Sequence, residues 1–591
     1  MTMPKTYKGV MNSLLMKSVN KTEDLLTTFE ALISQYGIIL DIDRDMDSIP
    51  AWSVVSLDIE HDEDGNMVGI GICHGNSCLY FTALSVSLIH YLCGVAFVAH
   101  NGISDMECLR QWGIPVRDEQ LVWDTMLCGH VIDSSLKSYG LKAMAERELG
   151  IIYPSYDDIV GKKTLKQKQE RVTLDRQPSR LVALYNAMDT YVTYKLWQEQ
   201  QKGYIQCNLF ASLEKPVSLI LQKMSNRGIR VDLHYLEGLK TSLEAQQIPI
   251  KAEITNELGP INLNSPRQLL EALNAKGIAP AYKGKPSTDK RALEPYRTVP
   301  LVAKLFAYSE LETLLSNFVN PYLERGQSII RPFYNQCGTR TGRLSCSNPN
   351  LLQIPRRTDN GKLVRRMFIP RDGMLMGDCD FGQIEPRVLA HLSKDPVLCK
   401  LFNDGTDFHQ FTAERLGISR DRAKILNLSV GYRATFKSVS AQLQCTDREA
   451  QNEIDKWWSL FPSLRRWQDD LLYEANRSGY CTTLLGRRIK VDNLSNGNKW
   501  QREAAQRQLI NNITQGSAAE IMKLAMIKCD KDLPNLGLLV QVYDELVFEE
   551  EESYMEDTMA LVLSCMENAI KLDVPLTVDC GIGPNWAMAK I

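Results

Sequence analysis

Two short acidic stretches in the second half of the chain have the residue types and the setting of a metal site. Asp380 follows the apolar residues 374–376 and precedes a segment of helical spacing, so we expect it where a strand ends and a helix begins. Asp544 and Glu545 lie between two apolar runs, as at the tip of a β-hairpin. Neighbouring carboxylates repel each other and favour a nearby cation. Asp380 and Asp544 could therefore hold two Mg²⁺ ions and support phosphoryl transfer.

These two stretches resemble a known family. Residues 380–387, Asp-Phe-Gly-Gln-Ile-Glu-Pro-Arg, and 541–548, Gln-Val-Tyr-Asp-Glu-Leu-Val-Phe, are similar to the two metal-binding palm motifs of family A (DNA polymerase I-like) DNA polymerases. Asp378 is a second acid on the same strand face, but its spacing to the rest of the motif favours Asp380 as the ligand. The resemblance implies a palm site made of Asp380, Asp544, Glu545 and, on the nucleotide side, Gln383 and Glu385.

Glu385 is the expected gate against ribonucleotides. A carboxylate packed beside Tyr432 would clash with a ribose 2′-OH and so favour dNTPs. Pro386 disfavours helical geometry at the residue before it, which predicts that Glu385 lies at the strand–helix junction. The second motif departs from the family at Tyr543, where His is typical, so the positioning of the primer end is expected to differ.

A stripe of side chains predicts a nucleotide-binding helix. Arg420, Lys424, Leu428 and Tyr432 recur every four residues, so they follow one helix face and change from basic to apolar to aromatic. This order suits a triphosphate at the positive helix end and a base on Tyr432. It resembles the fingers motif of the family, except that Leu428 replaces Phe or Tyr and Arg433 replaces Gly. Leu428 lacks the hydroxyl that a Tyr offers, so we expect strong rejection of dideoxynucleotides.

The resemblance gives the basic residues near this stripe their roles. Arg420, Lys424 and His409 would neutralise the phosphates, and Lys424 would also protonate the leaving pyrophosphate.

The segment 340–371 is rich in basic residues and in loop-forming residues, which indicates a surface that contacts DNA phosphates. Its motifs are similar to the primer–template segment of the family, in which Arg343 would reach the primer terminus. The turn Gly-Arg-Arg at 486–488 is read as a further phosphate-binding turn containing Arg487. A later helix is expected to contact the minor groove through Arg507, Asn511 and Gln515.

The first half of the chain contains a second set of acids. Asp58 and Glu60 are two residues apart on a predicted strand, so they share one face. Asp105 follows another buried strand, and Tyr185 and Asp189 are spaced for one helix face. Together these stretches resemble the 3′→5′ exonuclease motifs of the DnaQ-like group in the form fused to family A polymerases.

That resemblance implies that Asp58, Glu60, Asp105 and Asp189 hold two metal ions, while Tyr185 orients the attacking water. Asp43 and Asp45 form a competing pair after another apolar run. We prefer Asp58 and Glu60 because the second strand of a hairpin follows them directly.

The overall composition restricts the class of protein to which the chain can belong. The chain has 591 residues, a net charge of −3 and 44% hydrophobic residues, which is typical of a globular protein and gives no global sign of nucleic-acid binding. Its 15 Cys residues form no CxxC pair, so we interpret them as reduced residues of an intracellular protein. No apolar run is long enough to span a membrane, and the N-terminus lacks a signal-peptide core.

We therefore expect a multidomain α/β protein: an N-terminal segment at 1–50, an RNase H-like 3′→5′ exonuclease domain at 51–204 and a right-hand polymerase at 205–591. The thumb is expected at about 205–330, the fingers at about 401–480, and the palm at about 331–400 and 480–591. Too few residues precede the exonuclease for a 5′-nuclease domain, and this compact form resembles bacteriophage replicative polymerases.

The function implied is DNA-templated DNA polymerisation with proofreading, in phage DNA replication. The expected cofactor is Mg²⁺, two ions per active site, with Mn²⁺ as a substitute. The expected partners are primer–template DNA and dNTPs, with a phage helicase, primase or single-strand-binding protein as further candidates. We expect a monomer in the cytoplasm, which is that of the host if a phage encodes it. Two alternatives stay open: a 3′→5′ exonuclease with a weakened polymerase site, and a DNA-binding scaffold without turnover.

Overall fold

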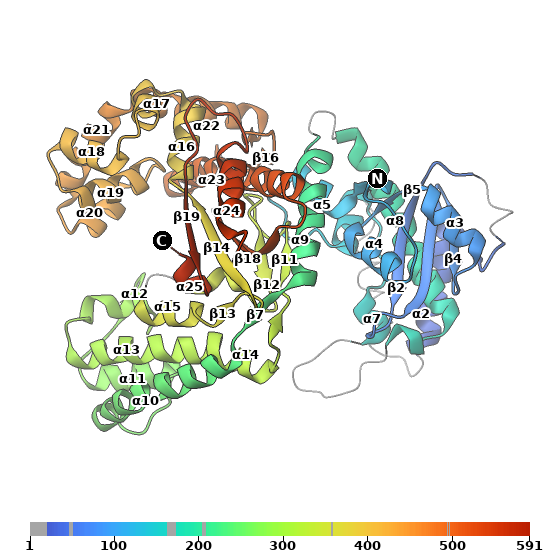
Figure 1. Cartoon of the computed structure of the whole chain (residues 1–591), viewed down its shortest axis with the longest axis horizontal. Coiled ribbons are helices and arrows are strands. Elements are labelled where there is room, and N and C mark those ends of the chain that lie inside the picture. Colours follow the sequence, from blue (N-terminus) through green and yellow to red (C-terminus); the bar gives the residue numbers. More distant parts are fainter. Residues whose placement is uncertain are drawn as a thin grey trace.

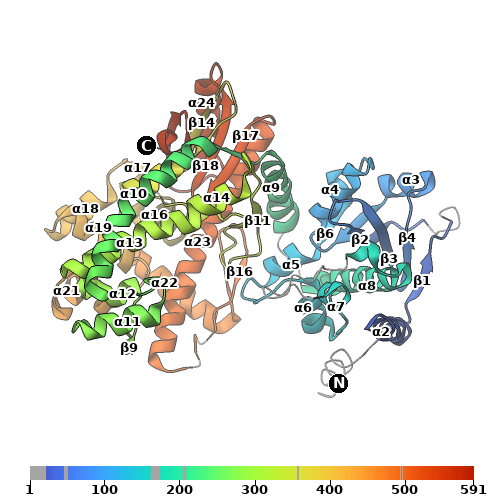
Figure 2. The same cartoon turned by 90° about the horizontal axis from the view of Figure 1, so that it is seen from below.

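The computed structural model describes residues 21–45, 51–161, 173–203, 208–355, 358–492, 494–495 and 497–590. These residues form an N-terminal domain, residues 21–203, and a larger C-terminal part, residues 208–590, that lie side by side (Figures 1 and 2). Of the N-terminal segment 1–50, residues 1–20 and 46–50 lie outside the described ranges. Among the described residues, no helix combines the length and the apolar character that crossing a bilayer requires.

A mixed six-stranded sheet forms the centre of the N-terminal domain, in the order β1-β4-β3-β2-β5-β6. Strands β2, β3 and β4 pair antiparallel, whereas β1 joins β4, β5 joins β2 and β6 joins β5 in parallel. The turn between β2 and β3 places Gly65 at φ 84°, which Gly adopts without steric cost. The strands are Ile39–Ile42, Val54–His61, Met67–His74, Ser77–Phe81, Ala96–Ala99 and Leu121–Asp124.

Helix α8 (Ser179–Gly203) covers one face of this sheet and contacts β2, β3 and β4. Helix α2 (Lys21–Gln35) packs on α8 and buries Leu25, Phe29 and Leu32. Strand β1 follows α2 and extends the sheet at its edge, so the described residues before 51 belong structurally to this domain. The remaining helices include α3 (Val86–Gly94), α4 (Gly102–Gln111), α5 (Thr125–Ile132), α6 (Leu141–Met144) and α7 (Tyr156–Val160).

The C-terminal part is built around an antiparallel sheet in the order β17-β18-β14-β19. Its strands are β14 (Met374–Phe381), β17 (Gly537–Val542), β18 (Glu545–Glu551) and β19 (Val578–Gly583), and the register sets Asp380 opposite both Glu545 and Asp579. The long helix α23 (Lys499–Asp532) packs against α24 (Met555–Glu567), which contacts β14 and β19. Both acidic stretches therefore meet at one end of this sheet.

Two helical groups flank the sheet, with α17 to α22 at one end and α10 to α14 at the other (Figure 1). The first group is α17 (Pro396–Asn403), α18 (Phe408–Leu416), α19 (Arg420–Val430), α20 (Phe436–Leu443), α21 (Asp447–Leu460) and α22 (Pro462–Ser478). The second includes α10 (Leu233–Leu258), α11 (Pro266–Ala275), α12 (Lys290–Leu293), α13 (Pro300–Leu314) and α14 (Asn320–Arg325). The assignment of these groups to the expected fingers, palm and thumb stays a prediction.

Candidate active sites

The N-terminal domain brings three of its predicted acids to one point. Asp58 and Glu60 lie on β2 and Asp189 lies on α8, and one ligand oxygen of each lies within 4.8 Å of the others. Asp58 is half-buried and the other two are buried. Three carboxylates this close form a donor set that fits a hard divalent cation.

Burial dominates the electrostatics of this cluster. Burial, followed by the charge of Asp189, raises the pKa of Asp58 to about 8. Burial and then the charge of Asp58 raise the pKa of Glu60. The acids therefore disfavour joint ionisation unless a cation offsets their charges.

The other two predicted residues also face the cluster. Asp105 lies in the first turn of α4, its Oδ2 is buried without a hydrogen-bond partner among the described residues, and burial and then Asp58 raise its pKa. Tyr185 lies one helical turn before Asp189, and burial and then the Asp189 charge raise its pKa. The competing Asp43 instead accepts hydrogen bonds from Thr82, with Thr82 N 2.7 Å from Oδ1 and Thr82 Oγ1 2.7 Å from Oδ2, at the sheet edge.

The sequence did not predict three further residues that contact the acidic cluster. Lys142 on α6 forms an ion pair with Asp189, and its Nζ lies 4.1 Å from the ring centroid of Tyr153 and 4.4 Å from that of Tyr185. The Tyr153 hydroxyl donates to Asp189 Oδ1 at 2.7 Å, and Asn186 Nδ2 donates to Asp58 Oδ2 at 2.8 Å. Asn186 could have been inferred because it shares α8 with both motif residues, but Lys142 carries no sequence signal.

In the C-terminal part, Asp380 at the end of β14 lies opposite Glu545 at the start of β18, and the backbone of Asp544 lies beside them in the turn between β17 and β18. The Phe381 amide donates to the Asp544 carbonyl at 3.0 Å, which fixes the turn against the strand. Tyr543 precedes the acids at φ 57° and is 47% exposed, so its ring faces outward from the tip.

Glu545 differs from Asp380 and Asp544 because its side chain is buried beneath the site. Its side chain is 0% exposed, and its Oε1 lies 3.2 Å from Arg365 Nη1 and accepts from Trp586 Nε1 at 2.9 Å. Burial alone would raise the pKa of Glu545, but the charges of Arg365 and Lys590, together with hydrogen bonds from Asp378 and Trp586, outweigh it and hold that pKa at about 2. Burial, followed by the charge of Glu545, raises the pKa of Asp378 to about 8.

The structure places three of the four residues of the predicted stripe on one helix, and the fourth lies beyond the helix end. Arg420, Lys424 and Leu428 lie on α19 and are exposed, with Leu428 at 52%, and Tyr432 follows in the turn after the helix. Arg433 occupies φ 60°, where Gly would have no steric cost, and its guanidinium is held by Gln468 and Asp469. Arg433 thus takes the position where the family has Gly, and its contacts with Gln468 and Asp469 stabilise its side chain there.

His409 lies behind this stripe. It is 7% exposed, its ring Nδ1 lies 3.0 Å from the Asn427 amide nitrogen, and burial lowers its pKa. A neutral His409 can offer a phosphate a hydrogen bond but no charge, so the charge on this face comes from Arg420 and Lys424.

Glu385 contacts its predicted neighbour, Tyr432, and also Arg343. It accepts a hydrogen bond from the Tyr432 hydroxyl and forms an ion pair with Arg343. Contrary to the expectation from Pro386, Glu385 is the second residue of helix α16 (Ile384–Ser393). Pro is tolerated there because first-turn amides have no acceptor within the helix. Gln383, at φ 52°, caps this helix and is exposed.

Arg507, Asn511 and Gln515 lie on α23 and are half-buried along one face. Gly516 lies beside them, and an added Cβ would come within 3.1 Å of the Thr341 carbonyl oxygen. This close approach lets the loop that carries Arg343 pack directly on α23.

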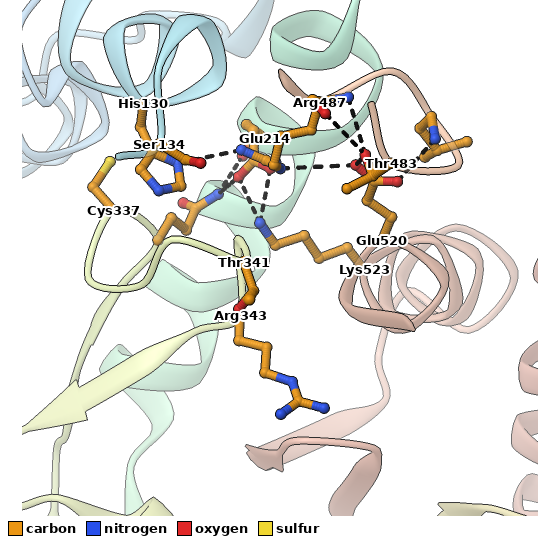
Figure 3. Close-up of polar contacts among 12 residues, drawn as sticks. His130, Ser134, Glu214, Cys337, Thr341, Arg343, Thr483, Arg487, Glu520 and Lys523 are labelled. Carbon is orange, nitrogen blue, oxygen red and sulfur yellow. Dashed lines mark hydrogen bonds and ion pairs between the residues drawn. The ribbon is translucent and has the colours of Figure 1, made fainter. Parts of the chain in front are cut away.

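The prediction that Arg487 contacts DNA phosphates is wrong. Arg487 is 0% exposed and lies in a buried cluster of charged side chains between the two parts of the molecule (Figure 3). It forms an ion pair with Glu214, lies 3.7 Å from Glu520 Oε1, and points Nη1 at His130 Nδ1 at 3.2 Å. Lys523 Nζ completes the cluster at 2.7 Å from Glu214 Oε1. A buried guanidinium needs such acids, so this Arg cannot reach a phosphate.

Comparison with known proteins agrees with this architecture. Residues 233–588 match the model for DNA polymerase family A, and residues 48–203 match that for a 3′-5′ exonuclease. The chain belongs to DNA polymerase family A. The expected fold is confirmed by these matches and by a solved structure described as the POL domain of Pol1 from M. smegmatis in complex with DNA primer-template and dNTP, which is 27% identical, with a TM-score of 0.79 over 98% of this chain and 99% of that chain.

Two curated relatives are similar in sequence. Thermostable DNA polymerase I of Thermus filiformis is 39% identical over 65% of this chain and 48% of that protein. DNA polymerase I of Rhizobium leguminosarum is 33% identical over 83% of this chain and 50% of that protein. The chain thus spans about half the length of the curated relatives it matches. Both relatives are bacterial, and nothing in them bears out a bacteriophage type.

Proposed function

We propose that the chain is a DNA-templated DNA polymerase that adds dNTPs to a primer 3′-OH and removes mismatched ends with its own 3′→5′ exonuclease. The observation that carries the proposal is the presence of two separate carboxylate clusters, each in the domain whose family it matches. One cluster suits nucleotidyl transfer and the other suits hydrolysis.

In the polymerase site, Asp380 and Asp544 would hold divalent ions, with Glu545 fixing the turn between them from below. We propose Mg²⁺, with Mn²⁺ as a substitute, which would lower the pKa of the primer 3′-OH and stabilise the pyrophosphate. Arg420 and Lys424 offer the triphosphate two positive charges on one helix face. Lys424 would also give the leaving pyrophosphate a proton.

Glu385 supports selection for dNTPs. Tyr432 and Arg343 hold its carboxylate from two sides, so it cannot rotate away from a ribose 2′-OH without losing both contacts. On the DNA side we propose contacts from Arg343, Arg507, Asn511 and Gln515.

In the exonuclease site, Asp58, Glu60, Asp105 and Asp189 would hold the metal ions, and Tyr185 would orient the attacking water. Asn186 and Lys142 hold Asp58 and Asp189 in place. Primer–template DNA and dNTPs are the proposed partners, and a monomer in the cytoplasm remains part of the proposal. A phage origin and a phage helicase, primase or single-strand-binding protein remain predictions.

The test uses a 5′-labelled primer on a longer template with Mg²⁺, with and without dNTPs. Extension with dNTPs and shortening without them would support both activities. Shortening under both conditions would favour the second candidate, a 3′→5′ exonuclease with a weakened polymerase site, which the departures at Leu428 and Tyr543 motivate. DNA binding that is unchanged by Mg²⁺, without turnover, would indicate a scaffold.

A further inference from the structure

The end of the described chain is fastened against the polymerase site. Helix α25 (Trp586–Ala589) buries Trp586 completely, and the indole donates to Glu545. Strand β19 passes so close that a Cβ on Gly583 would lie 2.5 Å from the Ala589 nitrogen. These contacts fix the position of the residue that follows the helix, Lys590.

Lys590 points its ammonium into the acidic cluster. Its Nζ lies 2.7 Å from Asp380 Oδ2, 3.1 Å from Asp378 Oδ1 and 3.1 Å from Glu545 Oε2. The Lys590 side chain is 21% exposed, whereas those of Asp378 and Glu545 are 2% and 0% exposed. One ammonium therefore bridges three carboxylates, and one of these is the acid proposed as a metal ligand.

Asp378 makes this arrangement more than a surface ion pair. It lies two residues before Asp380 on β14, so both carboxylates leave the same face of the strand. Its Oδ2 is buried and has no hydrogen-bond partner among the described residues. An acid buried this deeply needs a neighbouring cation, and Lys590 is the cation in contact with it.

We propose that Lys590 and Asp378 are positioning residues that set how strongly the polymerase site binds divalent metal ions. The inference rests on the proposed function. The ammonium occupies one carboxylate oxygen of Asp380, the residue proposed to hold a metal ion, so Lys590 would weaken metal binding by competition and by charge repulsion. Asp378 has the opposite effect, because it offers the ammonium a partner other than Asp380.

The test measures metal binding rather than turnover. Mn²⁺ binding is titrated by electron paramagnetic resonance on the full chain in complex with a dideoxy-terminated primer–template and the next dNTP. Every protein carries Asp58→Ala and Asp189→Ala, so that the exonuclease cluster does not contribute. The variants are Lys590→Met, Lys590→Arg, Asp378→Asn and, as a matched control, Lys456→Met, which removes an exposed lysine from α21.

We expect Lys590→Met to lower the Kd for Mn²⁺ about tenfold, the effect of removing one nearby unit charge in a partly hydrated site. Lys590→Arg should stay within about twofold of the parent because the charge is retained, and Asp378→Asn should raise the Kd. Thermal melting of each variant shows that it is folded.

An unchanged or raised Kd in folded Lys590→Met would overturn the inference, as would a lowered Kd in Asp378→Asn. Asp380→Ala separates this from failure of the proposed function. If Asp380→Ala leaves Mn²⁺ binding intact, the proposed metal site is wrong. If it abolishes binding while Lys590→Met changes nothing, only the role of Lys590 fails.

Discussion

The two acidic clusters use the same chemistry but are assembled differently. Each sets several carboxylates around one lysine. In the N-terminal domain, Lys142 lies over the rings of Tyr153 and Tyr185, so aromatic faces confine the ammonium. In the palm, Lys590 meets carboxylates only, and the buried Arg365 offsets Glu545 from below.

The difference lies in where the cations come from. Lys142 belongs to the same domain as its acids, so that cluster is complete within one folding unit. Arg365 and Lys590 come from segments of the C-terminal part that are far apart in sequence, and both depend on Trp586, which contacts Arg365 and Glu545. Both clusters draw their cations from their own part of the molecule, so a substitution in one part should leave the cluster of the other intact.

The strongest test removes one acid from each cluster. Asp380→Ala should reduce primer extension by more than about a thousandfold while exonuclease activity stays within twofold, because the loss is of a transition-state contact made in one site. Asp189→Ala should do the opposite. Both activities are measured on the same labelled primer, and extension that survives in Asp380→Ala contradicts the assignment.

The next test concerns the junction that joins the two parts. Burial and then Arg487 lower the pKa of His130 to about 3, so the folded protein binds this proton less readily than the unfolded chain, whose His titrates near 6.5. The stability from neutral His130 is complete above about pH 6.5 and is lost as the pH falls below it. Relative to His130→Gln, the wild type should lose about 2 kcal/mol of unfolding free energy between pH 7.5 and pH 5. Urea unfolding at both pH values measures this, and equal losses in the two proteins would refute it.

A smaller effect is expected at the lysine of the exonuclease cluster. Lys142→Met should lower the exonuclease rate about tenfold, because Asp189 loses its ion pair and the two Tyr rings lose the ammonium between them. Primer extension should not change. Lys195→Met is a suitable control, since Lys195 also lies near Tyr rings on α8 but its Nζ donates to Asn76 away from the cluster. Loss of exonuclease activity in both variants would point to a general effect on the domain.

The smallest effect concerns sugar selection, which only the polymerase site performs. Leu428 is exposed on α19 and has no hydroxyl. Leu428→Tyr should raise incorporation of ddTTP relative to dTTP at least about fivefold, the value of one modest hydrogen bond. The exonuclease should be unaffected. The ratio of kcat/KM values for the two nucleotides measures the change, and wild-type use of ddTTP at nearly the efficiency of dTTP would contradict the premise.

Motif residues on regular elements were predictable from the sequence. Strand alternation and helix spacing predicted that Asp58 and Glu60 share one strand face and that Tyr185 and Asp189 share one helix face, and the structure brings Asp58, Glu60 and Asp189 together. These inferences succeed because local periodicity fixes the direction of each side chain.

The errors and omissions have a common cause. The turn at 486–488 looked exposed from its composition, but buried acids from distant segments enclose Arg487. Lys142 and Lys590 were missed because a lone lysine in sequence is indistinguishable from a solvated one. The role of each lysine can be inferred only once the tertiary fold places acidic partners beside it. The backbone geometry next to Pro386 was likewise not predicted correctly from the sequence.

The buried charged cluster of Figure 3 also bears on how this architecture can be recombined. His130 accepts from Arg487 and donates to the Thr339 carbonyl at 2.8 Å, in the loop that leads to Arg343. An exonuclease domain transplanted from a distant homologue would have to bring a matching acceptor to the same point, or Arg487 would keep its acidic partners Glu214 and Glu520 but lose its buried contact across the boundary. The two parts therefore cannot be exchanged freely between homologues. The boundary of a chimera should be chosen so that His130 and Arg487 come from the same parent protein.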